Sequence, residues 1–571
     1  MLEWLPPQVL IGSSLVLVSV LTSVLAFRIG APLLLFFLGI GLIAGEDGLG
    51  VVYNDWSGAY LIGSMALAII LFDAGFGTKL RYFKKAAAPA LTLATLGVLI
   101  TTGFVGVAAH SLFGLPWTHA LLLGAIVSST DAAAVFYLLR VGGITLRERV
   151  RATLSVESGS NDPIAIFLVT ALVELIRAQS SLAELTFEVL IGFGWQMGGG
   201  IGVGLAGGWL LVRLMNAVDL EAALYPILVL AAALLLFGAA SQIGGSGFVA
   251  VYVAGLVAGN QAVPHRTALR RFQDGTTWLA QILMFLVLGL LATPSDFPAV
   301  VLPAMGLALF LMFVARPVAV GICLLPFRFS ARETAFIGWV GLRGAVSILL
   351  AILPFLGGVE DAERFFSVVF IMVLTSLLVQ GWTIKPVARR LELIVPRRLG
   401  PVEKIELELP GTAHHELVVY HVMPQSPIVG GARLPRWARP ALVLRDGRSM
   451  HFRKAGTLQP DDYIYIFMSP QYATALDHLF AGSHEQTASV RKFFGDFAIA
   501  TDAPVKALID VYGAKLAPIT AGAEKTSVGD YVQSRLKRPE AGDRVRIGSV
   551  VLIVRATDEK NRITAVGLSF D

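Results

Sequence analysis

The stretch Glu157-Ser-Gly-Ser-Asn-Asp162 runs directly into the apolar sequence Pro163-Ile-Ala-Ile-Phe-Leu168. On a helix, Glu157 and Asn161 stack at i and i+4, and Ser158 and Asp162 stack in the same way on the adjacent stripe. Counted from Arg151, Asp162 lies about 16 Å along the helix axis, which is too deep for a residue that caps a helix at a membrane surface. The stretch therefore predicts a polar site near the middle of a membrane-spanning helix, where ionisable side chains usually serve a function.

The composition also indicates a membrane protein. Of the 571 residues, 55% are hydrophobic and 15% are charged, and the mean hydropathy is +0.72, whereas soluble proteins average about 45–50% apolar and about 25% charged residues. The net charge of +5 comes from basic residues in short loops between apolar runs, which does not indicate a nucleic-acid partner. The single cysteine, Cys323, lies in an apolar run, so the cytoplasmic part is expected in a reducing compartment without disulfides.

Apolar runs of membrane-spanning length fill the chain as far as residue 385. Because a helix needs about 20 apolar residues to cross the hydrocarbon core, the sequence predicts roughly thirteen spans. They lie near residues 8–27, 31–45, 58–78, 89–111, 118–139, 150–176, 187–213, 222–241, 246–260, 273–292, 299–325, 333–356 and 365–385. The first run has no basic segment before it and no cleavage site after it, so it is expected to be a retained helix and not a signal peptide.

The basic residues of the loops alternate between two sides. If the N-terminus is outside, the opposite loops hold only Arg177 and Arg364, and every other loop basic residue is cytoplasmic: Arg28, Lys79, Arg81, Lys84, Lys85, Arg140, Arg147, Arg149, Arg151, Arg213, Arg266, Arg270, Arg271, Arg328, Arg332, Lys385, Arg389, Arg390, Arg397 and Arg398. The positive-inside rule then predicts a multi-pass protein of a bacterial inner (plasma) membrane, with its N-terminus outside and its C-terminal part in the cytoplasm.

Two other spans carry charges at a similar depth. Ser128-Ser-Thr-Asp131 in the fifth span predicts a locally unwound helix whose carbonyl groups bind a cation. Gly341-Leu-Arg-Gly-Ala345 in the twelfth span places Arg343 between two glycines, and its guanidinium is expected to pair with Glu157, since a buried charge needs a partner. Two interrupted spans that cross the membrane in opposite directions indicate an inverted repeat with the site at its interface.

Two further ionisable residues have less specific surroundings. Asp73, six residues before Lys79, is interpreted either as a charge in an access funnel or as a residue at the membrane rim. Arg316, directly before Pro317, is expected to play a structural role, with a lipid headgroup, a carboxylate or a freed carbonyl as its partner.

The pattern changes after about residue 400. Short β-type runs, among them Asp462-Tyr-Ile-Tyr-Ile-Phe467 and Ser549-Val-Val-Leu-Ile-Val554, alternate with Gly, Pro and Asp-Gly turn signals. This pattern predicts two small α+β cytoplasmic domains, at residues 400–476 and 490–571, with a polar linker near 481–489. The whole chain is thus expected to be an all-α polytopic membrane domain over residues 1–390 followed by these two domains.

With these residues the membrane part resembles the bacterial NhaP-type cation/proton antiporters, relatives of the animal sodium/proton exchangers. The resemblance rests on Glu157-Ser158 with Asn161-Asp162, on Thr130-Asp131, and on Gly341-Leu-Arg-Gly-Ala345, although Ala132 stands where the family commonly has proline. It implies a homodimer with a mobile core half, a K⁺ or Na⁺ ion and protons bound at Asp162 with the help of Asp131, Thr130 and Ser158, and a structural polar network of Glu157, Asn161 and Arg343.

The tail resembles two regulatory modules. Pro427-Ile-Val-Gly-Gly431, Leu444-Arg-Asp-Gly447 and Leu458-Gln-Pro-Asp-Asp462 are similar to the C-terminal lobe of potassium-conductance regulators. Residues 490–571 are similar to the transporter-associated domain of CorC/HlyC-type proteins. The combination is similar to that of the potassium/proton antiporters of cell-volume regulation, and it implies an unidentified small-molecule ligand on the tail.

These observations lead to one functional hypothesis and two alternatives. We expect a secondary active antiporter, without a cofactor and without enzymatic activity, that exchanges K⁺ for H⁺, one for one, by alternating access at Asp162 within membrane lipid. The first alternative is Na⁺/H⁺ exchange by the same fold. The second is a ligand-gated potassium channel, which the tail alone suggests; the chain has no Thr-Val-Gly-Tyr-Gly filter sequence.

Overall fold

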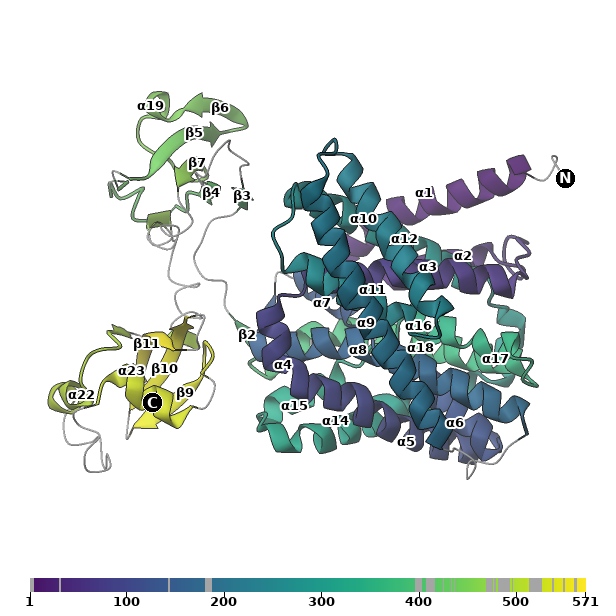
Figure 1. Cartoon of the computed structure of the whole chain (residues 1–571). Helices are drawn as coiled ribbons and strands as arrows, with labels where there is room; N and C mark the ends of the chain where they lie inside the picture. The colour runs from purple at the N-terminus through teal and green to yellow at the C-terminus, as the bar shows by residue number, and fades with distance from the viewer. Residues whose placement is uncertain are drawn as a thin grey trace. The chain divides into compact units, whose positions relative to one another are not determined.

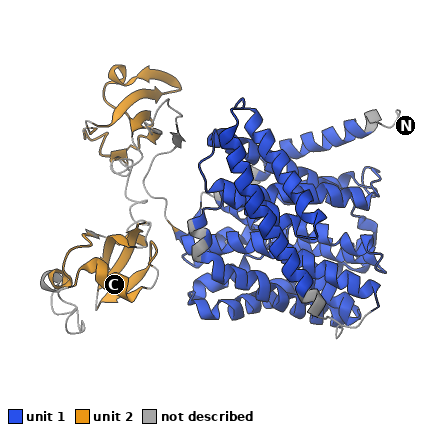
Figure 2. Cartoon of the chain, viewed as in Figure 1, with its two compact units in different colours: residues 1–394 blue, residues 395–571 orange. Residues whose placement is uncertain are grey.

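The computed structural model divides the chain into two compact units, Met1–Ile394 and Val395–Asp571 (Figure 2). It describes residues 5–29, 32–141, 144–179, 187–395, 403–406, 416–424, 426–432, 434–435, 437–468, 476, 479–480, 493–495, 497–512, 526–536, 539–547, 550–558 and 562–570. The expected linker 481–489 and the basic residues Arg397 and Arg398 lie outside the described residues.

Unit 1 is built from α-helices (Figure 1). They are α1 (Leu5–Ile29), α2 (Leu33–Ala44), α3 (Trp56–Gly77), α4 (Leu80–Thr92), α5 (Val98–Phe113), α6 (Trp117–Ile126), α7 (Ala132–Val141), α8 (Glu148–Arg177), α9 (Phe187–Ala217), α10 (Leu224–Gln242), α11 (Gly247–Gly259), α12 (Arg266–Leu290), α13 (Val301–Phe310), α14 (Arg316–Leu324), α15 (Ala331–Trp339), α16 (Ala345–Leu350), α17 (Leu353–Leu356) and α18 (Ala362–Arg390). Side-chain caps start several of them, including Asp55 for α3, Ser246 for α11 and a Ser330–Glu333 capping box for α15.

The helices of unit 1 are those of a multi-pass membrane protein. Among the described residues, eight helical segments are long and apolar enough to cross a membrane, and four further apolar helices are shorter. Large apolar side chains such as Trp195, Leu205 and Trp209 on α9 are exposed, as expected of a surface that faces lipid. The number of thirteen spans remains a prediction, because helix length and composition alone do not establish it.

The same succession of three helix types occurs twice along the chain of unit 1. A helix with a π-helical turn comes first: Leu93–Gly97 lies between α4 and α5, and Leu311–Ala315 lies between α13 and α14. A broken helix follows, α6–α7 in one half and α15–α16 in the other, and a long helix, α8 or α18, comes third. Because π-helical turns are rare, this repetition supports the internal repeat that the two charged breaks indicate.

The residues that follow α18 are hydrogen-bonded to the residues just before α8. Strand β1 (Thr145–Leu146) pairs with β2 (Ile394–Val395) in a two-stranded sheet. The backbone N–H of Arg147 also donates to the carbonyl of Leu393 at 3.2 Å, and Leu393 is buried. An exposed ion pair between Arg332 and Glu392 joins the same segment to α15. The chain that leads out of α18 therefore contacts the connection between α7 and α8.

Unit 2 contains two antiparallel sheets. The first, in the order β3-β4-β7-β5-β6, consists of β3 (Glu403–Glu406), β4 (Glu416–His421), β5 (Arg439–Arg445), β6 (Arg448–His451) and β7 (Tyr463–Met468), with the short helix α19 (Phe452–Ala455) after β6. The second, in the order β8-β11-β10-β9, consists of β8 (Phe497–Ile499), β9 (Arg544–Ile547), β10 (Val550–Thr557) and β11 (Ile563–Phe570), with helices α22 (Val505–Tyr512) and α23 (Val528–Arg535). The sheets fall within 400–476 and 490–571, and the division of the tail into two domains stays a prediction.

Candidate cation site

The break between α6 and α7 leaves Val127–Asp131 outside regular helix. The Asp131 backbone N–H donates to the carbonyl of Leu342 at 2.8 Å, which joins this segment to the second break. Oδ1 of Asp131 accepts from the N–H of Ala134 at 3.1 Å and thereby caps α7. The unwinding predicted around Ser128–Asp131 is thus present, and α7 begins at Ala132 without a proline.

The second break leaves residues 340–344 outside helix, between α15 and α16. A Cβ atom at Gly344 would collide with the Asp131 carboxylate, and one at Gly341 would lie 3.1 Å from Cγ of Arg316. The two glycines that flank Arg343 therefore allow an acidic and a basic side chain to lie against the unwound backbone. This explains why Gly-Leu-Arg-Gly occurs where the helices cross.

Helix α8 adds its polar face to the crossing. Asp162 is 4% exposed, and its Oδ1 accepts a hydrogen bond from the hydroxyl of Ser129. Asn161 Nδ2 donates to Oγ1 of Thr130 at 2.7 Å, and Oγ of Ser158 accepts from the N–H of Ala132 at 3.2 Å. The i and i+4 spacing in the sequence thus brings both polar stripes of α8 against the break at Val127–Asp131.

The predicted pairing of Arg343 with Glu157 is wrong. Glu157 is paired with Arg316, whose Nη2 lies 2.6 Å from Oε1, and both side chains are buried. Nη1 of Arg343 instead donates to the carbonyl oxygens of Ser128 and Ser129, at 2.7 and 2.6 Å. The reason is that a broken helix exposes carbonyl groups that need donors, and these carbonyls lie closer to Arg343 than the carboxylate that the sequence suggested.

The crossing presents oxygen atoms of a kind that small cations bind. A carboxylate as buried as that of Asp162 is costly unless a proton, a cation or hydrogen bonds compensate its charge. The oxygen atoms near it come from side chains of both α8 and the unwound segment, including Ser129 and Ser158. Oxygen ligands of this kind suit alkali cations and protons, and hydrogen bonds of Asn161 and Asp162 tie the continuous helix α8 to the unwound segment.

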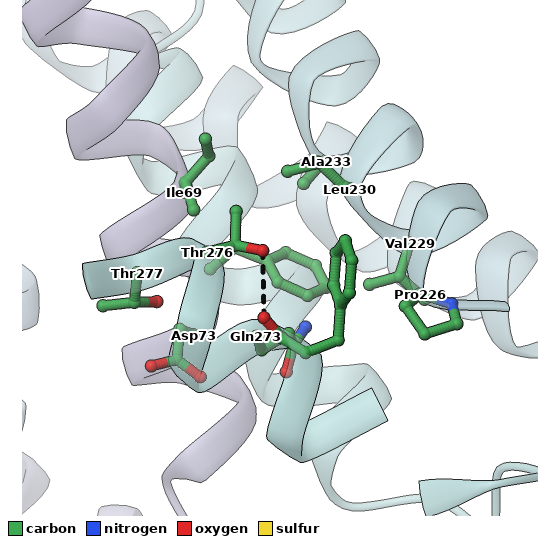
Figure 3. A pocket seen from close by; sticks show the side chains of 11 residues that line it. Ile69, Asp73, Pro226, Val229, Leu230, Ala233, Gln273, Thr276 and Thr277 are labelled. Atoms are coloured by element: carbon green, nitrogen blue, oxygen red, sulfur yellow. Dashed lines mark hydrogen bonds between the residues drawn. The ribbon is translucent and has the colours of Figure 1, made fainter. Parts of the chain in front are cut away.

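Asp73 lies elsewhere in unit 1. It is half-buried and lines a small pocket with other residues of α3, α10 and α12: Ile69, Phe72, Pro226, Val229, Leu230, Ala233, Phe272, Gln273, Thr276 and Thr277 (Figure 3). Neither Asp131 nor Asp162 is among the lining residues. The assignment of Asp73 to an access funnel remains a prediction.

Sequence reasoning assigned no role to three uncharged polar residues of the crossing. Ser129 contacts Asp162 directly, and Ser376 and Gln380 on α18 bond to the backbone of the second break. Ser376 and Gln380 stand four residues apart in the apolar stretch of α18. That spacing is the available signal, since polar side chains at i and i+4 within a membrane helix share one face.

The comparisons with known proteins agree with this fold. The transmembrane pattern of the sodium/hydrogen exchangers matches residues 14–390. The "K(+)/H(+) antiporter NhaP2" of Shewanella sp. (strain ANA-3) is 42% identical over 98% of this chain and 97% of its own. The "K(+)/H(+) antiporter NhaP" of Alkalimonas amylolytica is 40% identical over 98% of each.

A solved structure has the same fold. The sodium proton antiporter MjNhaP1 of Methanocaldococcus jannaschii superimposes with a TM-score of 0.58 at 24% identity, covering 66% of this chain and all of that one. The 66% of this chain that is covered corresponds in length to the membrane part without the tail. Together with the family pattern over residues 14–390 and the full-length relatives, it shows that the chain belongs to the sodium/hydrogen exchanger family.

Proposed function

We propose that the chain is a secondary active antiporter that exchanges K⁺ for H⁺ across the inner membrane, with Asp162 as the shared carrier. The observation that carries the proposal is the 4% exposed Asp162 carboxyl group at the crossing of two broken helices. A membrane-buried carboxylate needs a compensating proton or cation. Competition of both for Asp162, helped by Thr130, Asp131 and Ser158, couples their movement in opposite directions.

Charge balance supports exchange of one cation for one proton. The crossing and its neighbourhood hold three carboxyl groups, on Asp131, Glu157 and Asp162, and two guanidinium groups, on Arg316 and Arg343. With all five ionised the group carries one negative charge, which a single proton or a single monovalent cation neutralises. Alternating access with only neutral bound states then gives electroneutral transport.

Potassium is the favoured cation. Relatives named as K⁺/H⁺ antiporters align with 98% of the chain at 42% and 40% identity, tail included. A relative named as a Na⁺/H⁺ antiporter, from Halobacillus aidingensis, is 31% identical over 58% of the chain. Exchange of Na⁺ by the same site is therefore the second candidate.

The remaining assignments concern assembly and regulation. The loop charges support an N-terminus outside and a cytoplasmic tail. We place the protein in the membrane as a homodimer, whose tail forms two domains at 400–476 and 490–571 that bind a small cytosolic molecule. Such a ligand changes transport through its differential affinity for two tail arrangements.

Transport by purified protein in liposomes tests the function. A fluorescent pH probe inside the liposomes should report proton movement when external K⁺ is added, with half-maximal response at a lower concentration of K⁺ than of Na⁺. Asp162→Asn should abolish the response because an amide does not titrate, whereas Asp274→Asn, at an exposed position on α12, should leave it unchanged. Retained proton-coupled transport in Asp162→Asn overturns the carrier assignment, and large K⁺ currents without a pH gradient would indicate a channel.

A further inference from the structure

Two side chains of α18 replace a missing backbone hydrogen bond. In a continuous helix the N–H of Arg343 would donate to the carbonyl of Trp339, four residues earlier. Here the N–H of Arg343 donates to Oγ of Ser376 at 3.1 Å. Ser376 Oγ donates to Oε1 of Gln380 at 2.6 Å, and Gln380 Nε2 donates to the Trp339 carbonyl at 2.7 Å. The two polar side chains therefore stand between the donor and the acceptor that would otherwise close the break.

The peptide group between Leu342 and Arg343 is hydrogen-bonded through both its carbonyl and its N–H. Its carbonyl, that of Leu342, accepts the N–H of Asp131 at 2.8 Å. Its N–H, that of Arg343, is the one that Ser376 accepts. Any rotation of this peptide that frees Ser376 also turns the Leu342 carbonyl away from Asp131. The orientation of the first break, Val127–Asp131 between α6 and α7, therefore depends on the side chain of Ser376.

The pair on α18 corresponds to the pair on α8. Ser158 accepts a backbone N–H from the first break, and Asp162 stands four residues after it. Ser376 accepts a backbone N–H from the second break, and Gln380 stands four residues after it. One half of the repeat thus holds an acid where the other holds an amide. Because an amide does not titrate, Gln380 keeps its hydrogen bonds whichever ligand occupies Asp162.

We propose that Ser376 and Gln380 are positioning residues for the cation site. They keep residues 340–344, the second break, from closing into a continuous helix. They act through Leu342, whose carbonyl holds Asp131, and through Arg343, whose guanidinium holds the carbonyls of Ser128 and Ser129. Both side chains are buried, Ser376 at 2% exposure and Gln380 at 0%, so water does not substitute for them. The transport readout of this inference rests on the proposed exchange activity.

The test compares Ser376→Ala, Gln380→Leu and the double variant in liposomes. Each single variant removes two of the three hydrogen bonds, and it is expected to raise the K⁺ concentration for half-maximal exchange by about tenfold or more. The double variant should lose at least as much exchange as the singles, because Arg343 and Trp339 can then bond directly and close the break. The same direct bond should make it more stable to heat than Gln380→Leu. Ser376→Thr keeps the hydroxyl and should restore wild-type behaviour.

Thr375→Val is the matched control. Thr375 is the neighbouring buried residue, and its hydroxyl donates to the carbonyl of Ile371 within α18, so its loss should leave the half-maximal K⁺ concentration unchanged. Hydrogen–deuterium exchange of peptides covering residues 336–346 gives a readout that needs no transport, and slower exchange in the double variant is expected as the helix closes. The inference is overturned if the double variant matches wild type in both measurements. A wild-type protein without cation exchange would instead overturn the proposed function and leave the deuterium result valid.

Discussion

Arg316 and Glu157 form an ion pair with 2.6 Å between Nη2 and Oε1, inside unit 1, where both side chains are 4% exposed or less. Arg316 opens α14, directly after the π-helical turn Leu311–Ala315, and Glu157 lies on α8, five residues before Asp162. The pair therefore connects the π-interrupted helix of one half of unit 1 to α8 in the other half.

Loss of one partner of this pair should destabilise the protein. Glu157→Gln or Arg316→Met leaves an unpaired buried charge, which we expect to lower the free energy of unfolding by about 3–5 kcal/mol, while the double variant costs less. Thermal unfolding in detergent measures the coupling in a double-mutant cycle. A larger coupling of Glu157 with Arg343 than with Arg316 would contradict the pairing seen here.

Gly344→Ala should disturb the crossing of the broken helices. The added methyl group would collide with the Asp131 carboxylate, and such overpacking typically costs about 1–3 kcal/mol. We expect a lower melting temperature and a higher K⁺ concentration for half-maximal exchange. Gly306→Ala on α13, where a Cβ would have no neighbour within 4 Å, is the control. Equal behaviour of the two variants would show that Gly344 does not need to be small.

The tail should lose stability in acid because of one carboxyl group. Asp462 accepts from Arg445 Nε and Nη2, both at 2.8 Å, and from the N–H of Gln459 at 2.8 Å. Burial alone would raise the pKa of Asp462, but these hydrogen bonds and the Arg445 charge outweigh it and lower the pKa below the ordinary value. The stabilisation is therefore complete above the unfolded-state pKa of about 3.9 and disappears as the pH falls through the lower folded-state pKa.

Hydrogen–deuterium exchange of β5 and β7 peptides in the full-length protein measures this effect, after correction for the intrinsic pH dependence of exchange. Wild type should lose protection below about pH 4. Asp462→Asn should be less protected at neutral pH and should show a smaller change on acidification. An unchanged acid response in the variant would assign the loss to other groups.

The position of a tail truncation should decide its effect. A chain that ends at Val395 keeps β2 and the buried Leu393, whereas one that ends at Arg390 loses both. Loss of the buried leucine side chain typically costs about 2–5 kcal/mol, so only the shorter chain should melt earlier. Exchange in liposomes across pH 6 to 9 should show the ion site intact in the longer truncation, with an altered pH or ligand dependence of the rate. Superimposable profiles of this truncation and the full chain would show that the tail does not regulate transport.

The sequence allowed the two helix breaks and the charged residues at their crossing to be predicted, because charges are rare in membrane helices. Asp162, Asp131 and Arg343 each stand out in an apolar run, and the glycines beside Arg343 and the hydroxyls beside Asp131 indicated the two breaks correctly. The partner of Arg343 was wrong because side-chain type does not show which face of α15–α16 meets α8 and which meets the exposed carbonyls of Ser128 and Ser129. Ser376 and Gln380 were missed because uncharged polar side chains are common enough in such helices to attract no notice.

The two hydrogen bonds from Arg343 to the carbonyls of Ser128 and Ser129 bear on ion selectivity. Rings of backbone carbonyls are one means by which membrane proteins distinguish K⁺ from the smaller Na⁺. In this chain a tethered guanidinium already occupies two of the carbonyls that the first break exposes, so a travelling cation must rely more on side-chain oxygens, which move inward or outward to suit its radius. We therefore expect the preference for K⁺ over Na⁺ to be smaller than that of a carbonyl-lined filter and to come from the side-chain oxygens.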